Sequence, residues 1–149
     1  NAEFHHIGHH LCHAAAAFYS SSYDDAAILC LDGFGDGKSG LLAYGKKNEI
    51  QPIKYIDLEN SIGLEYLRVT FQIGLGSFGA EGKTQGLAAY ADPTFFDDYM
   101  NEIKLTEDGG FLLSEKIKNM EGYLKGEHYI ENKSLFNDFI LERIDRRFQ

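Results

Sequence analysis

The sequence has few basic residues and no long apolar run, and each shortage excludes a class of protein. Lysine and arginine number 14 against 23 aspartate and glutamate residues, which gives a formal net charge of −9. Such a charge repels a phosphate backbone, so no direct nucleic-acid partner is expected. No stretch approaches the roughly 20 apolar residues of a membrane-spanning helix, and no basic-then-apolar leader opens the chain. We therefore expect a cytoplasmic protein that does not enter a membrane.

Cysteine is also scarce, since Cys12 and Cys30 are the only two and both lie in apolar periodic segments. Reduced, buried thiols are expected there rather than a disulfide framework. What the chain does have is the balance of one soluble domain, with 149 residues, 44% hydrophobic and 25% charged. A chain of this length forms a core without a structural metal, so a bound metal would be functional. Because the chain starts at Asn1 without methionine, we expect a piece of a larger protein.

The hydrophobic pattern predicts an α/β fold that begins with a helix and a meander of three strands. Residues 9–20 combine alanine, leucine and aromatic residues at helical spacing, which predicts a helix. Apolar or alternating runs then predict strands over residues 26–32, 41–46 and 50–58, with Pro52 at a sheet edge. We expect these strands in one mixed sheet, with the first helix packed close to its edge.

Glycine and proline divide the rest of the chain. Asn60 or Ser61 is expected to cap a helix that runs to about Ile73. The elements predicted beyond it are a flexible glycine-rich loop over 74–86, a short helix over 87–91, helices over 95–103 and 133–148, and a turn at Gly109-Gly110 between short strands. A shift towards charge after Asp92-Pro93 places a soft boundary there, between residues 1–93 and a helical or mixed continuation of the same domain over residues 94–149.

Two histidines on the first predicted helix are the first candidates for chemistry. His9 and His13 are one helical turn apart, which puts both imidazoles on one face, about 5–6 Å apart at Cβ. That spacing suits a divalent cation, although core or capping histidines give the same pattern. His10 takes the place of the glutamate in the HExxH motif, which argues against a zinc peptidase because the usual general base is missing.

Asp32 is the third candidate, because it ends a predicted buried strand and opens a turn that contains Gly33, Gly35 and Gly37. A carboxylate in that place can bind a cation while the amide groups of the turn receive phosphate oxygens. The alternative is a plain hairpin, in which aspartate and glycine merely suit the turn dihedral angles. Two imidazoles and one carboxylate form the facial ligand set of iron(II), with zinc or manganese as alternatives, and leave positions open for substrate.

Four motifs occur in order within residues 5–93, namely HHxxHAxxAFY, DGxGD, SxGxxY and EGKxxGLAxYxDP. In these motifs the chain resembles the amino-terminal domain of the O-carbamoyltransferases of nodulation and antibiotic biosynthesis, which is related to the universal tRNA threonylcarbamoyl transferase. The resemblance implies part of an actin, Hsp70 and sugar-kinase fold, which is RNase H-like, with helices flanking the meander.

The resemblance also implies an activity. A carbamoyl group would pass from carbamoyl phosphate, through carbamoyl adenylate made with ATP, to a hydroxyl group of a small acceptor, at a site that holds iron(II). Carried over by motif, the metal ligands would be His9, His13 and Asp32. The metal would act as a Lewis acid that stabilises negative charge as the acceptor oxygen attacks.

Further roles follow from the same resemblance. Asp32 and Lys83 are the candidate catalytic residues, and Lys83 would contact nucleotide or carbamoyl oxygens; the alternative is an ordinary solvated lysine. The candidate residues for binding nucleotide phosphates, through their backbone, are Gly33, Gly35, Gly37, Ser61 and Gly63. His5 and His6 are expected to be solvent-exposed or to lie around the metal ligands.

Domains of this family need a later carboxylate ligand and an initial phosphate-binding hairpin, and the sequence contains neither. The chain is therefore expected to be inactive alone, with the rest of the parent chain completing the site. Two other functions stay open. One is a subunit that forms tRNA threonylcarbamoyladenosine, against which the acidic charge argues and which a salt-dependent tRNA-binding assay would test. The other is a non-catalytic actin-like module, in which removal of metal would leave nucleotide affinity unchanged.

Overall fold

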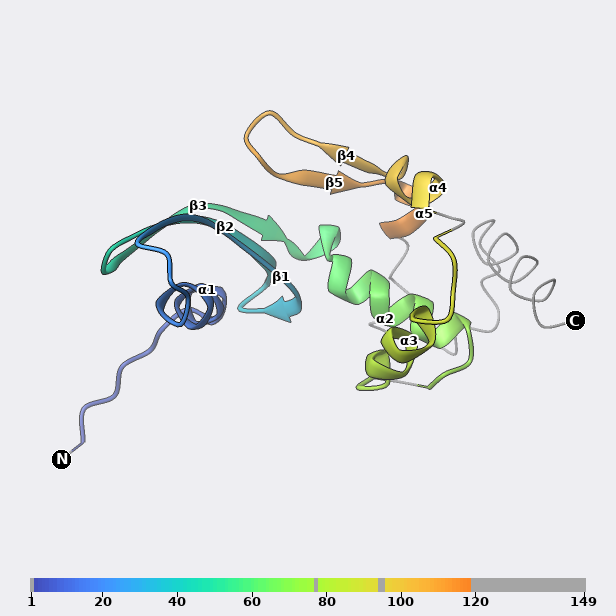
Figure 1. Ribbon diagram of the computed structural model, residues 1–149, viewed down its shortest axis with the longest axis horizontal. Coiled ribbons are helices and arrows are strands. Elements are labelled where there is room, and N and C mark those ends of the chain that lie inside the picture. The colour runs from blue at the N-terminus through green and yellow to red at the C-terminus, as the bar shows by residue number, and fades with distance from the viewer. Residues whose placement is uncertain (1, 77, 94–95, 119–149) are drawn as a thin grey trace, which may run out of the picture. The chain divides into compact units, whose positions relative to one another are not determined.

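The computed structural model describes residues 2–76, 78–93 and 96–118 (Figure 1). Contacts divide the chain into two compact units. The first contains Asn1–Leu64 and Leu105–Phe111, and the second contains Glu65–Lys104 and Leu112–Gln149. The helix predicted over residues 133–148 lies outside the described residues.

Three strands of the first unit form an antiparallel meander in the order β1-β2-β3. They are β1 (Asp25–Gly35), β2 (Lys38–Lys46) and β3 (Glu49–Asp57). This confirms the predicted meander and the α/β class, but the expectation of a mixed sheet is wrong for these strands. The pairing is antiparallel because two-residue loops, Asp36-Gly37 and Lys47-Asn48, join consecutive strands, and so short a loop can only reverse the chain.

Helix α1 (His9–Tyr19) packs mainly on the edge strand β1 and also contacts β2 and β3. Figure 1 shows it against one face of the sheet. The residues that form the core between helix and sheet are Ala14, Phe18, Ile28, Cys30, Leu41 and Ala43. Phe18 lies so close to Gly45 that a Cβ there would be 2.7 Å from its ring.

The two cysteines differ in exposure. Cys30 is buried in this core, as predicted, and burial raises the pKa of its thiol. Cys12 is exposed, so the prediction of two buried thiols is wrong for this residue. Cys12 precedes His13, which is also exposed, whereas Ala14, the next residue, is buried.

Helix α2 (Ile62–Gln72) follows a short 3-10 helix, η1 (Leu58–Asn60). The Oγ of Ser61 accepts a hydrogen bond from the N–H of Leu64 at 3.0 Å, which confirms Ser61 as the predicted cap. Serine is effective here because its oxygen satisfies an amide that has no partner inside the helix.

The later turns of α2 belong to the second unit and carry a buried ion pair. The guanidinium of Arg68 binds both carboxylate oxygens of Glu65, with Nε to Oε2 at 2.7 Å. Burial raises the pKa of Glu65, and the hydrogen bond and charge of Arg68 act in the opposite direction. The hydroxyls of Thr70 and Thr84 are 2.7 Å apart and join α2 to α3 (Glu81–Ala88).

Helix α3 corrects two predictions. Residues 81–86, expected in a flexible loop, are helical, and the helix ends at Ala88 instead of beginning at Leu87. Its glycines, Gly82 and Gly86, lower helix propensity, which is why the pattern suggested a loop. The hydroxyl contact of Thr84 with α2 is tertiary and is invisible to local propensity.

The remaining elements are short. Helix α4 (Phe96–Met100) ends before the predicted Ile103, which instead begins β4 (Ile103–Leu105). β4 pairs with β5 (Phe111–Leu113), and the predicted turn between them is confirmed, with Gly109 at a φ of 82°. Helix α5 covers Glu115–Lys118.

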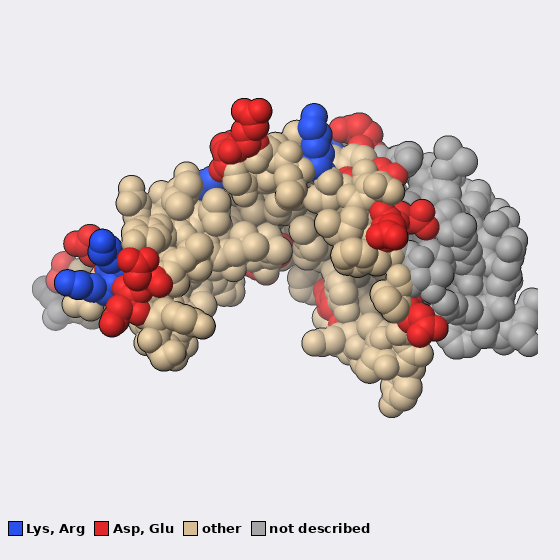
Figure 2. Space-filling model, turned by 45° about the horizontal axis from the view of Figure 1, so that its top comes forward, with Lys and Arg blue, Asp and Glu red and all other residues tan. Residues whose placement is uncertain are grey.

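Charge and helix length bear on the function classes considered above. Among the described residues, none of the helices combines the length and apolar character that crossing a bilayer needs. On the face shown in Figure 2, acidic side chains are more common than basic ones.

Candidate metal centre

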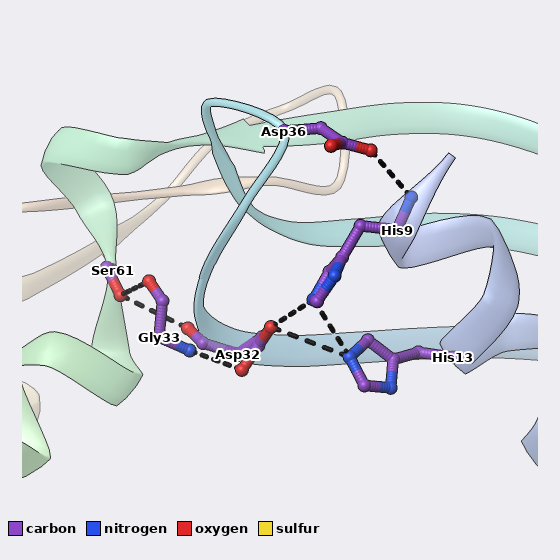
Figure 3. Close-up of polar contacts among 6 residues, drawn as sticks. All are labelled: His9, His13, Asp32, Gly33, Asp36 and Ser61. Atoms are coloured by element: carbon purple, nitrogen blue, oxygen red, sulfur yellow. Dashed lines mark hydrogen bonds and ion pairs between the residues drawn. The ribbon is translucent and has the colours of Figure 1, made fainter. Parts of the chain in front are cut away.

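Three side chains of the first unit converge on one point (Figure 3). His9 is the first residue of α1, His13 lies one turn later, and Asp32 projects from β1. The Nε2 of His9 is 2.6 Å from the Oδ2 of Asp32 and 3.0 Å from the Nε2 of His13. The Nε2 of His13 is 3.5 Å from the same Asp32 oxygen. The predicted convergence of these three residues is therefore confirmed.

The donor set fits a divalent cation. A metal ion that is about 2.0–2.2 Å from nitrogen or oxygen ligands can contact all three atoms only if no two are more than about 4 Å apart. The separations of 2.6, 3.0 and 3.5 Å satisfy that condition. The side chains keep between 32% and 52% of their surface exposed, so the site is accessible to solvent. Two imidazoles and one carboxylate suit iron(II), zinc or manganese.

Asp32 is in the state that a metal ligand needs. Its partial burial raises the pKa of the carboxyl. Hydrogen bonds from His9 and the Gly33 N–H, together with the charges of both histidines, lower that pKa by more than burial raises it. The net pKa lies below the ordinary value. The carboxylate is therefore ionised at neutral pH, with one oxygen towards the histidines and the other 2.7 Å from the Gly33 nitrogen.

The start of α2 holds the backbone that carries Asp32. The hydroxyl of Ser61 lies 2.6 Å from the carbonyl oxygen of Gly33 and 3.1 Å from that of Asp32. A Cβ on Gly63 would be 2.5 Å from the Gly33 nitrogen, so only glycine allows this close approach. Ser61 and Gly63, which were predicted to bind phosphate, thus position Asp32. A contact of either with phosphate stays a prediction.

The three glycines of the predicted phosphate turn have three different environments. Gly37, with a φ of 74°, and Asp36, with a φ of 50°, form the tight loop between β1 and β2. Gly35 lies against His9, and a Cβ on it would be 2.1 Å from the imidazole. Gly33 faces open space. The hairpin interpretation therefore holds for Asp36-Gly37, and phosphate binding by these glycines stays a prediction.

Asp36 and His10 are neighbours of the site that the sequence did not single out for a role in it. The Oδ2 of Asp36 accepts a hydrogen bond from the backbone N–H of His9 at 2.7 Å. His10 is 2% exposed, its ring centroid is 4.9 Å from that of His9, and its Nε2 has no hydrogen-bond partner among the described residues. Burial lowers the pKa of His10, with a further contribution from His9, which favours a neutral ring.

Lys83 belongs to the second unit, on α3, and is exposed. Its Nζ donates a hydrogen bond to the carbonyl oxygen of Leu75 at 3.2 Å. The lysine is therefore on a helix and not in the predicted loop, and its catalytic role stays a prediction. His5 and His6 are exposed, and His5 lies 3.7 Å from the carboxylate of Glu3.

Comparison with known proteins assigns the family. The family described as carbamoyltransferase N-terminus matches residues 2–144. The chain belongs to this carbamoyltransferase family. The resemblance inferred from the four sequence motifs is thereby confirmed, while the actin-like and RNase H-like fold stays a prediction.

Two rhizobial proteins are among the relatives of this carbamoyltransferase domain. It is 40% identical over 106 residues to the nodulation protein NolNO of Sinorhizobium fredii, covering 70% of this chain and 15% of that protein. It is 35% identical over 106 residues to the nodulation protein NolO of Bradyrhizobium diazoefficiens, covering 70% of this chain and 19% of that protein. An uncharacterised Synechocystis protein is 38% identical over 107 residues, covering 71% of this chain and 17% of that protein. The chain thus spans less than a fifth of the length of these relatives.

Proposed function

We propose that this domain provides the metal-binding part of an O-carbamoyltransferase that uses carbamoyl phosphate and ATP. The carbamoyl group passes through carbamoyl adenylate to a hydroxyl group of a small acceptor. The observation that carries the proposal is the convergence of His9, His13 and Asp32, in a chain of the carbamoyltransferase family, into a ligand set that suits one divalent cation.

The three residues have distinct parts in holding the ion. His9 and His13 present their Nε2 atoms from one helix face, and Asp32 presents an ionised oxygen from the sheet. When bound, the metal, which we propose is iron(II), supplies Lewis-acid stabilisation of negative charge on carbamoyl or phosphate oxygens. The exposed side of the three ligands leaves room for a substrate oxygen.

The resemblance to the O-carbamoyltransferases supports the choice of acceptor class. Both NolNO and NolO carry names that refer to nodulation, and the family is named for carbamoyl transfer. A hydroxyl-bearing small molecule is proposed as the acceptor, as that resemblance implies. ATP, carbamoyl phosphate and the remainder of a longer polypeptide are the other proposed partners, in the cytoplasm.

The test uses the complete polypeptide that contains this domain. Its iron content is measured, and transfer of radiolabelled carbamoyl from carbamoyl phosphate, with ATP, is followed onto a set of hydroxyl-bearing sugars. We expect stoichiometric metal and ATP-dependent transfer. The combined replacement His9→Ala, His13→Ala and Asp32→Asn should remove both metal and transfer.

The matched control replaces the two exposed histidines outside the site. His5→Ala with His6→Ala removes two imidazoles from the same terminal region and should leave metal content and transfer unchanged. Full transfer by the triple ligand variant, or equal metal content in that variant and the unaltered protein, would overturn the proposal.

A further inference from the structure

The start of α1 has no cap from its own neighbourhood. Gly8 occupies the N-cap position without a side-chain hydrogen bond, and the first turn contains no acidic residue. The first N–H groups of a helix have no partner inside the helix, so an end without a cap unwinds readily. His9 is the first helical residue, and unwinding there would carry its imidazole away from Asp32 while His13 stayed in place.

The missing cap comes from the tip of the β1–β2 hairpin. The carboxylate of Asp36 accepts the N–H of His9 at 2.7 Å, although the two residues are 27 positions apart. A negative charge at a helix amino terminus also interacts favourably with the helix dipole. Figure 3 shows the result: His9 is held at its backbone by Asp36 and at its ring by Asp32.

The same hairpin limits where the ring of His9 can lie. The α-carbon of Gly35 faces the imidazole so closely that an added Cβ would be 2.1 Å from it. Gly35 immediately precedes Asp36, so one short segment contacts both the backbone and the ring of His9. Asp36 itself is not among the residues whose ligand atoms converge on the metal centre.

We propose that Asp36 is a positioning residue of the metal centre. By accepting the N–H of His9, it keeps the first turn of α1 wound and thereby keeps the His9 imidazole beside Asp32. It acts through His9 and not as a ligand. This inference rests on the proposed function, because it assigns a role towards the same metal.

The backbone at Asp36 determines which variants are informative. Its φ of 50° is in the left-handed region, which glycine and asparagine tolerate and most other residues do not. Asp36→Gly keeps the loop and removes the capping oxygen, whereas Asp36→Asn keeps both the loop and an acceptor oxygen. Lys47→Gly is the matched control, since Lys47 is the first residue of the β2–β3 loop and has a φ of 53°.

The experiment titrates Co²⁺, as a spectroscopic probe, into the complete polypeptide and follows the visible absorption bands. We expect Asp36→Gly to weaken Co²⁺ binding about tenfold, the range that loss of a helix cap implies. The absorption bands of Co²⁺ bound to this variant should also change, because the imidazole of His9 is less firmly positioned. Asp36→Asn should recover most of the affinity, and Lys47→Gly should match the unaltered protein in affinity and spectrum.

The possible failures are distinguishable. If the unaltered protein binds Co²⁺ and Asp36→Gly binds it with the same affinity and spectrum, the role of Asp36 is wrong and the metal centre stands. The role is equally wrong if Asp36→Gly lowers only the melting temperature of the metal-free protein. If the unaltered protein binds no Co²⁺ at all, the proposed metal centre is overturned, and the role of Asp36 with it.

Discussion

Two helices begin beside the same stretch of β1, and they are held there in different ways. The start of α2 is capped by Ser61, which precedes the helix, is 1% exposed and also bonds to the β1 backbone. The start of α1 is capped by Asp36, which comes from a distant hairpin, in an exposed hydrogen bond. The backbone that carries Asp32 is held by part-buried hydrogen bonds from Ser61, which is 28 and 29 positions away. The backbone of His9 instead has an exposed hydrogen bond to Asp36, and its ring depends on Asp32 and on the fit against Gly35.

The largest expected effect is on the weakly held ligand. Gly35→Ala places a methyl group where the His9 ring lies and should displace the imidazole, weakening Co²⁺ binding up to about 100-fold. Gly33→Ala is the matched control, because a Cβ there meets nothing within 4 Å. Calorimetric titration with Co²⁺ measures both, and equal affinities would show that the ring does not need this surface.

A substitution at the start of α2, which contacts the backbone beside Asp32, should lower the stability of the fold. Gly63→Ala drives a Cβ to 2.5 Å from the Gly33 backbone, which cannot move aside as a flexible side chain can. We expect a loss of about 1–3 kcal/mol in the free energy of unfolding, measured in urea. Gly86→Ala, in open space on α3, should instead be neutral or stabilising by about 0.5–1 kcal/mol. A neutral Gly63→Ala would contradict the close approach.

The α2 cap should have a smaller effect than the glycine beside it. Ser61→Ala removes the acceptor for Leu64 and the donor to the β1 carbonyls, and should cost about 1–2 kcal/mol of unfolding free energy. Ser20→Ala, at the exposed end of α1, should change it by less than about 0.5 kcal/mol. Equal effects in thermal unfolding would mean that the buried cap does not anchor Asp32.

The smallest effect concerns the β4–β5 turn, where Asp108 pairs with Lys54 of β3. Hydrogen bonds from Lys54 and Thr106 lower the pKa of Asp108 from 3.8 to about 2. Because the folded pKa is the lower one, this contact contributes stability above pH 4 or so, and the contribution is lost as pH falls towards 2. Asp108→Asn should remove that small part of the acid dependence in melting temperature. Glu107→Gln removes the same charge one residue away and should leave this acid dependence of the melting temperature unchanged.

Local patterns predicted much of the molecule that positions the site. The pattern of residues 9–20 and the apolar run before Asp32 predicted a helix and a strand, and the resemblance of the motifs to the carbamoyltransferases implied that their histidines and Asp32 converge. Ser61 was readable as a cap because a capping oxygen acts on amides only three residues away. Asp36 was not, because the amide it caps is far away in sequence and near only after the hairpin closes.

The sequence alone determined the ligand types, the helical spacing of the two imidazoles and the family, since these depend on residue identity and short-range periodicity. The role of each glycine, in contrast, depends on the tertiary structure. Gly37 serves a turn, Gly35 makes room for an imidazole and Gly63 lets a helix touch a strand. The role of a glycine depends on which group packs against its α-carbon, and only the folded structure brings that group next to it.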